Sequence, residues 1–69
     1  MLIIKTMDTF SVKIRAWREM TKLSQKEFAG RADVHVNTVM RVESGKNVTI
    51  FQLSKIAKAM GMTLAELVA

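Results

Sequence analysis

The chain has 69 residues, with 11 lysines and arginines against 6 aspartates and glutamates and a formal net charge of +5. One domain of this size has too small a core to enclose a cofactor cleft as well, so we expect neither an enzyme nor a bound cofactor. With no cysteine and a single histidine there is no disulfide framework and no metal-ligand set. No apolar run approaches the roughly 18 residues of a membrane helix. We therefore expect a cytoplasmic protein with no membrane contact, whose excess positive charge favours a polyanionic partner.

Three capping boxes of the pattern S/T-x-x-E/Q predict helix starts. They are Ser24-Gln-Lys-Glu27, Thr49-Ile-Phe-Gln52 and Thr63-Leu-Ala-Glu66. Together with apolar residues at helical spacing, these boxes predict five helices. The predicted helices cover residues 10–20, 25–32, 36–44, 50–59 and 64–68. Gly45 and Gly61 fit the left-handed positions that end the third and fourth helices.

The fold class expected from this pattern is an all-α, compact five-helix domain. It occupies residues 9–69 and follows an N-terminal arm or short extended segment at residues 1–8. Within that segment, Leu2-Ile-Ile-Lys5 fits either an extended arm or a short edge strand, and the pattern does not decide between them.

The second and third predicted helices are separated by only three residues, Asp33-Val-His35. Two short helices joined by such a turn form a helix-turn-helix, which places its second helix in the major groove of DNA. The spacing therefore predicts double-stranded DNA as the partner.

The third predicted helix divides into a buried side and an outward side. On a helical wheel Val39 and Val42 fall on one side, whereas Asn37 and Arg41 fall on the other. Asn37 can pair bidentately with adenine and Arg41 with guanine, while Val36 can pack against a thymine methyl group. We expect these three residues to read bases, although Arg41 can instead reach a phosphate.

Five motifs carry a resemblance to a known family. They are Ile14-Arg-Ala-Trp-Arg-Glu19, Leu23-Ser-Gln-Lys-Glu-Phe-Ala29, Ala32-Asp-Val34, Asn37-Thr-Val-Met-Arg-Val-Glu-Ser-Gly-Lys46 and Leu53-Ser-Lys-Ile-Ala-Lys-Ala-Met-Gly61. With these motifs the chain resembles the lambda-repressor-like, Cro/XRE-type helix-turn-helix domains over most of its length. The resemblance implies a five-helix bundle, in agreement with the helix count, and a DNA-binding function.

Local departures from the family pattern fall at helix ends and in one loop. Lys22 and Asp33 stand where glycine is common, and aspartate tolerates a positive φ better than most residues. His35 replaces the usual serine or threonine before the third helix, where it is expected to act as a cap or to contact a phosphate. The loop Lys46-Asn-Val-Thr49 lacks the usual proline and resembles the shorter loop of some antitoxins and restriction-modification controllers.

Four residues are candidates for phosphate contact. Gln25 opens the second helix, whose N-terminal dipole favours an anion, and the resemblance implies the same contact. Lys46 and Asn47 follow the third helix and are placed to meet the sugar-phosphate backbone, which fixes register without reading sequence. Thr38 is read either as a DNA contact or as a hydroxyl that lines the helix.

The resemblance also implies a structural ion pair between Arg18 in the first helix and Glu43 at the end of the third. We expect this pair to orient the third helix, because breaking one partner of a buried pair leaves the other charge uncompensated.

The C-terminal segment 59–69 contains no lysine or arginine. An apolar end on a basic body suits a homodimer contact away from phosphate, through Leu64, Leu67 and Val68, with residues 2–4 as a second contribution. The alternative is that these side chains cover the core of the monomer. A dimer would present two recognition helices about 34 Å apart to an inverted repeat.

The function expected from these features is a sequence-specific transcriptional regulator, in the first place a dimeric repressor that occludes its operator. Two alternatives stay open. One is an antitoxin that regulates its own operon and binds a toxin protein. The other is a restriction-modification controller.

Overall fold

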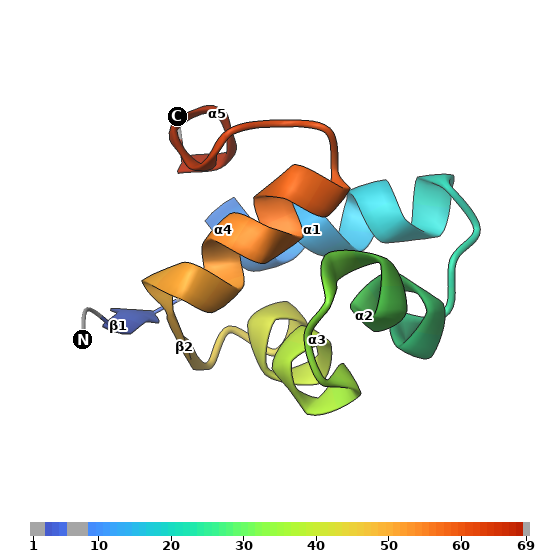
Figure 1. Ribbon diagram of the computed structural model, residues 1–69, viewed down its shortest axis with the longest axis horizontal. Helices are drawn as coiled ribbons and strands as arrows, with labels where there is room; N and C mark the ends of the chain where they lie inside the picture. The colour runs from blue at the N-terminus through green and yellow to red at the C-terminus, as the bar shows by residue number, and fades with distance from the viewer. Residues whose placement is uncertain (1–2, 6–8, 69) are drawn as a thin grey trace.

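The computed structural model describes residues 3–5 and 9–68, and within these ranges five helices enclose one core (Figure 1). The helices are α1 (Thr9–Met20), α2 (Gln25–Ala32), α3 (Val36–Glu43), α4 (Ile50–Ala59) and α5 (Leu64–Val68). Their bounds agree with the prediction to within one residue at every end. None of these helices is long and apolar enough to cross a membrane.

A short two-stranded sheet accompanies the five helices of the expected all-α fold. Strand β1 (Ile3–Lys5) pairs antiparallel with β2 (Asn47–Thr49), and Ile4 lies opposite Val48. Residues 3–5 therefore form the edge strand that the sequence left undecided, while Leu2 and residues 6–8 lie outside the described residues. Strands of three residues are too short to give a readable alternation of apolar and polar side chains.

All three predicted capping boxes form at helix starts. At α2, the Ser24 hydroxyl accepts a hydrogen bond from the Glu27 N–H, and the Glu27 carboxylate accepts one from the Ser24 N–H. The same reciprocal pair starts α4 and α5. Each box satisfies two backbone donors that the first turn leaves without helical partners.

Helices α1 to α4 end in the same way. In each, one residue adopts the left-handed conformation, and its N–H and the next N–H donate to carbonyls of the last turn, which is a Schellman motif. The four left-handed residues are Lys22, Asp33, Gly45 and Gly61. The first two take up this conformation without glycine's freedom, as their departure from the family pattern suggested.

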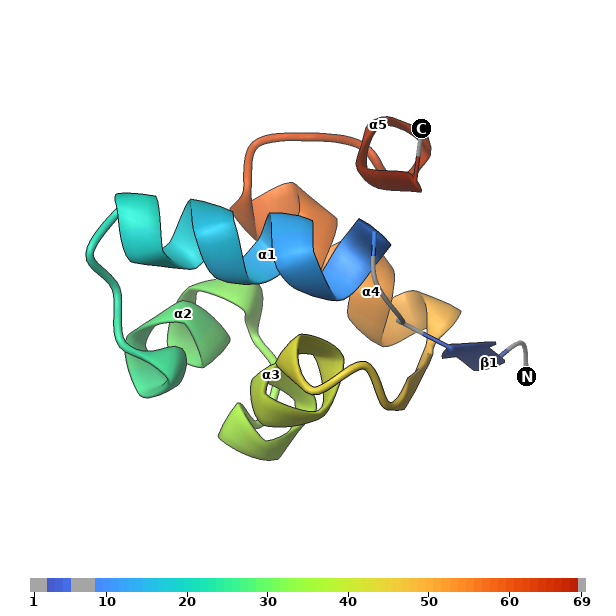
Figure 2. The same ribbon diagram turned by 180° about the vertical axis from the view of Figure 1, so that it is seen from behind.

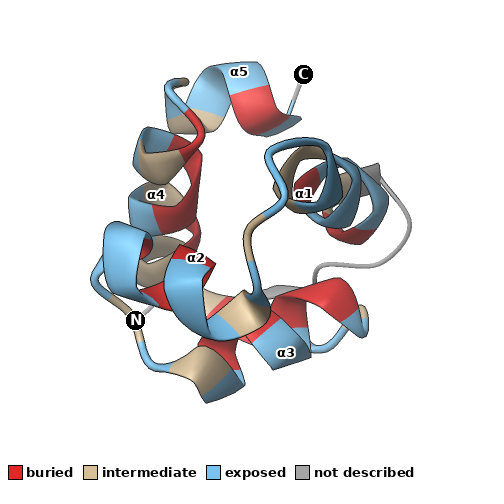
Figure 3. Ribbon diagram, turned by 90° about the vertical axis from the view of Figure 1, so that its right-hand side faces the viewer, coloured by how far each residue is buried: buried red, intermediate tan, exposed pale blue. Residues whose placement is uncertain are grey.

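The core collects side chains from every helix, and Figure 3 shows the buried residues of α1, α3 and α4 on the sides that face the interior. The fully buried large side chains are Ile14, Phe28, Val39, Val42, Leu53, Ile56 and Leu67. Trp17 packs on this core with its ring tilted against Phe28, at 5.6 Å between centroids. Figure 2 shows α1 lying between α5 on one side and α3 on the other, which agrees with its contacts to both.

Candidate nucleic-acid interface

The turn between α2 and α3 has a defined geometry. Asp33 is left-handed, with φ 56° and ψ 45°, and its N–H donates to the carbonyls of Ala29 and Gly30. Val34 is half-buried against the core. His35 then caps α3, because its Nδ1 accepts a hydrogen bond of 3.1 Å from the Asn37 N–H. The expected capping role of His35 is confirmed, and α3 leaves α2 in a fixed direction.

The outer side of α3 carries exposed polar side chains, as predicted. Val39, Val42 and Glu43 are buried, whereas Asn37 and Arg41 are exposed. The outer side borders a shallow hollow of about 290 Å³, lined by Asn37, Met40, Arg41, Ser44 and Lys46. The polar members of this lining offer hydrogen-bond donors and acceptors, with one cation on α3 and a second just beyond it, which is the chemistry that base edges and phosphates require.

Two residues of α3 lie deeper than expected. Val36 is half-buried and packs against the core, so only part of its side chain is available outside. Thr38 is buried, and its hydroxyl accepts a hydrogen bond of 3.3 Å from the side-chain amide of Gln52 in α4. Of the two roles expected for Thr38, this burial favours a hydroxyl that lines the helix, and it disfavours a contact to DNA.

The guanidinium of Arg41 is held by the backbone beyond its own helix. Its Nε and Nη2 both donate to the carbonyl oxygen of Asn47, at 3.2 and 2.8 Å. Asn47 is the first residue of β2, and its side chain and that of Lys46 are exposed. Both residues thus lie directly beyond the recognition helix, as the sequence predicted.

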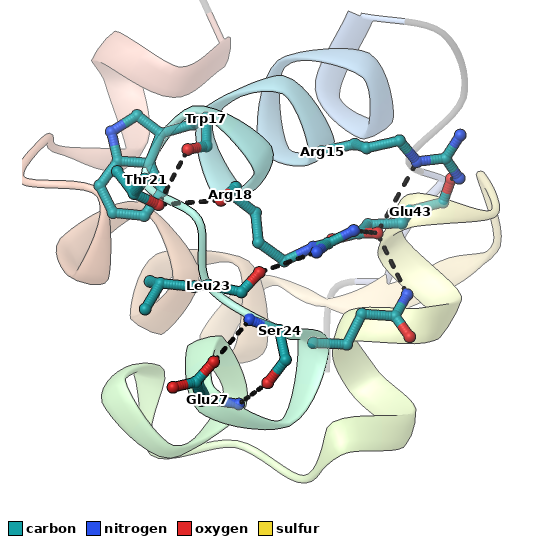
Figure 4. Close-up of polar contacts among 9 residues, drawn as sticks. Arg15, Trp17, Arg18, Thr21, Leu23, Ser24, Glu27 and Glu43 are labelled. Carbon is teal, nitrogen blue, oxygen red and sulfur yellow. Dashed lines mark hydrogen bonds and ion pairs between the residues drawn. The ribbon is translucent and has the colours of Figure 1, made fainter.

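Glu43 is the buried acceptor of a polar cluster beneath this surface (Figure 4). Arg18 donates to both of its carboxylate oxygens, one of them at 3.0 Å from Nη2, so the predicted ion pair is present. This hydrogen bonding raises the pKa of Arg18 above its ordinary value. Arg18 also donates to the Leu23 carbonyl at 2.9 Å, which ties the pair to the loop between α1 and α2.

Gln25 joins the same cluster from the start of α2. Its Nε2 donates to a carboxylate oxygen of Glu43 at 3.1 Å, and the side chain is half-buried. The glutamine expected to contact phosphate is therefore fixed against α3 by its amide. At this end of α2 the capping box also takes up the backbone N–H groups of Ser24 and Glu27.

Arg15 is a member of the cluster that the sequence did not single out. Its Nη2 donates to the backbone carbonyl of Glu43 at 2.8 Å, and its Nε lies 3.7 Å from a carboxylate oxygen. A cation at this end of α3 also complements the helix dipole. The three-residue spacing between Arg15 and Arg18 places both on one side of α1, and this spacing was the available signal.

The three residues expected at a dimer interface differ in how far they are buried in the structure. Leu67 is fully buried in the core of the single chain, so its assignment to an interface is wrong. Leu64 is half-buried against that core, and Val68 is 43% exposed. The five-residue helix α5 turns Leu67 inward, and the next residue consequently faces out.

Phe51 is an exposed apolar side chain that was not predicted from the sequence. It is 66% exposed on the first turn of α4. It precedes the buried Leu53 by two residues, or about 200° of helix, and so lies opposite the buried stripe. A wheel drawn for α4 would have identified it.

A second hollow with basic walls lies between α2 and α4. It measures about 400 Å³ and is lined by Arg31, Ala32, Asp33, Lys55, Lys58 and Ala59. The ammonium of Lys55 donates to the backbone and side-chain oxygens of Asp33, at 3.2 and 3.5 Å. Nowhere in residues 3–5 and 9–68 do three or more histidine, cysteine, aspartate or glutamate side chains gather as a metal site would need.

The capped α3 with its outward polar side, fixed against α2 by a three-residue turn, defines a helix-turn-helix protein. A family model described as Helix-turn-helix, HTH_3, matches residues 14–67, and the chain belongs to this family of Cro/C1-type XRE domains. The protein is accordingly a DNA-binding regulator with a five-helix lambda-repressor-like fold.

The chain is 40% identical over 60 residues to Control protein C.MunI from Mycoplasma sp, a restriction-modification control protein. This match covers 84% of the chain and 81% of the control protein. The fold is also similar to solved structures of Fe(II) HppE in complex with substrate and of hydroxypropylphosphonic acid epoxidase from S. wedmorenis. Each gives a TM-score of 0.69, with 26% and 28% identity. Both likenesses cover 93% of this chain, which spans only 36% and 35% of those structures.

Proposed function

We propose that this protein is the controller of a restriction-modification system and regulates transcription by binding DNA near the genes it controls. The observation that carries the proposal is the exposed Asn37 and Arg41 on a capped helix whose opposite side is anchored in the core. The 40% identity to a control protein supports this choice of target genes. A dimeric repressor, the main expectation from the sequence, has no comparable support beyond the shared DNA-binding class.

Sequence choice would come from the outer side of α3. The Asn37 amide both donates and accepts, which matches the N6 and N7 edge of adenine, and the Arg41 guanidinium matches O6 and N7 of guanine. The exposed part of Val36 adds an apolar contact for a thymine methyl group. Each bidentate contact discriminates against a wrong base by about 1–3 kcal/mol.

Affinity would come from contacts to phosphate on both sides of α3. The helix dipole at the start of α2, where Gln25 is fixed, would favour a phosphate there, and the exposed Lys46 and Asn47 would provide donors beyond α3. Such contacts set register and make binding depend on salt, because each neutralised phosphate releases counterions.

We further propose that two copies bind together through α5. Val68 and the exposed part of Leu64 form an apolar surface there, in a segment without lysine or arginine. Replacing Val68 by lysine should shift the protein toward monomer in sedimentation velocity. The control is Met20→Lys, which adds the same charge at an exposed apolar residue of α1. An equal shift in both variants, or in neither, would refute an interface at Val68.

The proposed function is tested by footprinting the protein on the DNA that flanks its own gene. We expect a protected inverted repeat in front of a neighbouring endonuclease or methyltransferase gene, and a reporter on that DNA to change expression when the protein is present. Protection confined to unrelated operators would contradict the controller. Co-purification of a small toxin protein from the native operon would favour the antitoxin instead.

A further inference from the structure

Arg41 uses only part of its hydrogen-bonding capacity on Asn47. A guanidinium has five N–H donors, one on Nε and two on each terminal nitrogen. The carbonyl of Asn47 takes the Nε donor and one Nη2 donor. The edge formed by Nη1 and the second Nη2 hydrogen is therefore directed away from that carbonyl. Two parallel donors on that edge suffice for O6 and N7 of guanine.

The acceptor that orients this arginine belongs to the small sheet. Asn47 begins β2, and its partner in the antiparallel pair is Lys5 of β1, more than forty residues earlier in the chain. Figure 1 shows β1 beside β2, and β2 in turn contacts α3. Arg41 lines two hollows, the one over α3 and another of about 310 Å³ that is lined by Asn47, Val48, Thr49 and Gln52. Without a fixed carbonyl its long side chain has room in both directions.

We propose that β1 is a positioning element for sequence reading: its pairing with β2 fixes the Asn47 carbonyl, which holds Arg41 in the orientation that meets a base. A side chain already held in its bound orientation loses less conformational freedom on binding. The effect falls on discrimination at one base pair and not on the phosphate contacts. This inference rests on the proposed function, in which Arg41 reads DNA.

The test breaks the strand pairing in the full chain with the double substitution Ile3→Pro and Ile4→Pro. Successive N–H groups of a strand point to opposite edges, so one of these two N–H groups faces β2. Replacing both residues by proline removes that donor, whichever of the two it is. The matched control, Ile3→Val with Ile4→Val, keeps both N–H groups and the β-branched character. Binding is measured to a selected duplex and to duplexes changed at each base pair, at several salt concentrations.

We expect discrimination at one base pair to fall about threefold to tenfold in the proline variant, with no change in the slope of affinity against salt. In an Arg41→Ala background the proline substitutions should cause no further loss at that pair. In the free protein, the Arg41 Nε–H should exchange faster with solvent in the proline variant than in the valine control, as measured by ¹⁵N NMR.

Three results would overturn the inference. They are unchanged discrimination with unchanged Nε–H exchange, a loss spread over all base pairs, or a loss that persists in the Arg41→Ala background. If the proline variant unfolds, Ile4→Gly weakens the strand more gently and should show the same loss at a smaller size. Should Arg41→Ala alone leave discrimination intact, base reading by Arg41 fails, and the exchange of its Nε–H still decides whether β1 holds it.

Discussion

Glu43 lies on α3 but receives side-chain hydrogen bonds from α1 and α2, so a single carboxylate connects three helices. Its side chain is 1% exposed, and that of its partner Arg18 is 14% exposed. A buried carboxylate is tolerated only when its oxygens are paired, and here Arg18 and Gln25 pair them. The direction of the DNA-facing helix thus depends on one charge beneath it.

Substituting Glu43 by glutamine should lower the free energy of unfolding by about 3 kcal/mol, because Arg18 then loses its counter-charge in a nearly buried position. Urea unfolding followed by circular dichroism measures this change. The control Glu19→Gln alters an exposed carboxylate of α1 and should stay within about 0.5 kcal/mol of the parent. A change at Glu43 no larger than that of the control would show that the cluster contributes little.

The substitution Asn37→Ala tests DNA binding and not the stability of the fold. Asn37→Ala should cost about 1–3 kcal/mol of binding to the selected site and relax the preference at one base pair, since the amide matches adenine. Competition binding against a set of single-pair variants measures this preference. The slope of affinity against salt is the internal control and should not change. A uniform weakening on all duplexes would assign Asn37 to the phosphate backbone.

Helix ends are where local sequence and structure agree most closely. The boxes at Ser24, Thr49 and Thr63 predicted three helix starts because each uses residues three positions apart. Glycine marked the ends of α3 and α4, and the turn at Asp33 was predictable from aspartate's tolerance of positive φ. Interactions within four residues can be read directly from the chain.

Features that depend on distant residues were less accessible. Thr38 is buried, and Gln52, fourteen positions later, donates to its hydroxyl. Strand β1 exists because β2 lies beside it, and three residues carry no periodic signal of their own. The burial of Leu67 depends on how α5 folds back over α1 and α4. The ion pair of Arg18 and Glu43 was predictable only through the family resemblance, and Arg15 was not predicted.

The left-handed residue after α1 is a site where stability can be gained. Lys22 adopts φ 59°, a conformation that costs a residue with a Cβ roughly 1 kcal/mol and costs glycine almost nothing. Lys22→Gly should therefore raise the free energy of unfolding by about 1 kcal/mol in urea denaturation. The matched control Lys26→Gly lies within α2 and should lower it by a similar amount. A loss of stability in both variants would contradict the role of backbone conformation at Lys22.

The capping box of α2 should give stability a dependence on pH. Hydrogen bonds from the backbone N–H and the hydroxyl of Ser24 hold the pKa of Glu27 below its ordinary value of 4.5. A lowered pKa in the folded state adds stability above the unfolded value and loses it as pH falls through the folded value. The unfolding temperature of the parent should thus be higher than that of Glu27→Gln at neutral pH. The two unfolding temperatures should converge below pH 4.5. A difference that is constant with pH would refute this contribution.

The whole molecule is small enough for two copies to share one face of DNA. Its extents are 29 × 22 × 19 Å, and half-sites separated by one helical turn are about 34 Å apart. In the proposed dimer, one copy per half-site would therefore fit without overlap, with α3 of each copy in a major groove. The net charge of +5 favours binding to any duplex regardless of sequence, and under the proposed function the side chains on α3 would add the specificity.

Sequence-specific DNA binding through α3 is tested most directly by selecting bound sites from random duplex DNA at moderate salt. Salt is then titrated on the selected duplex and on a scrambled duplex. We predict an enriched inverted repeat with half-sites about one helical turn apart. Both duplexes should lose affinity steeply with salt, while the selected one keeps its advantage, because base contacts release no counterions. Binding without enrichment, equally sensitive to salt on both duplexes, would contradict sequence reading by α3.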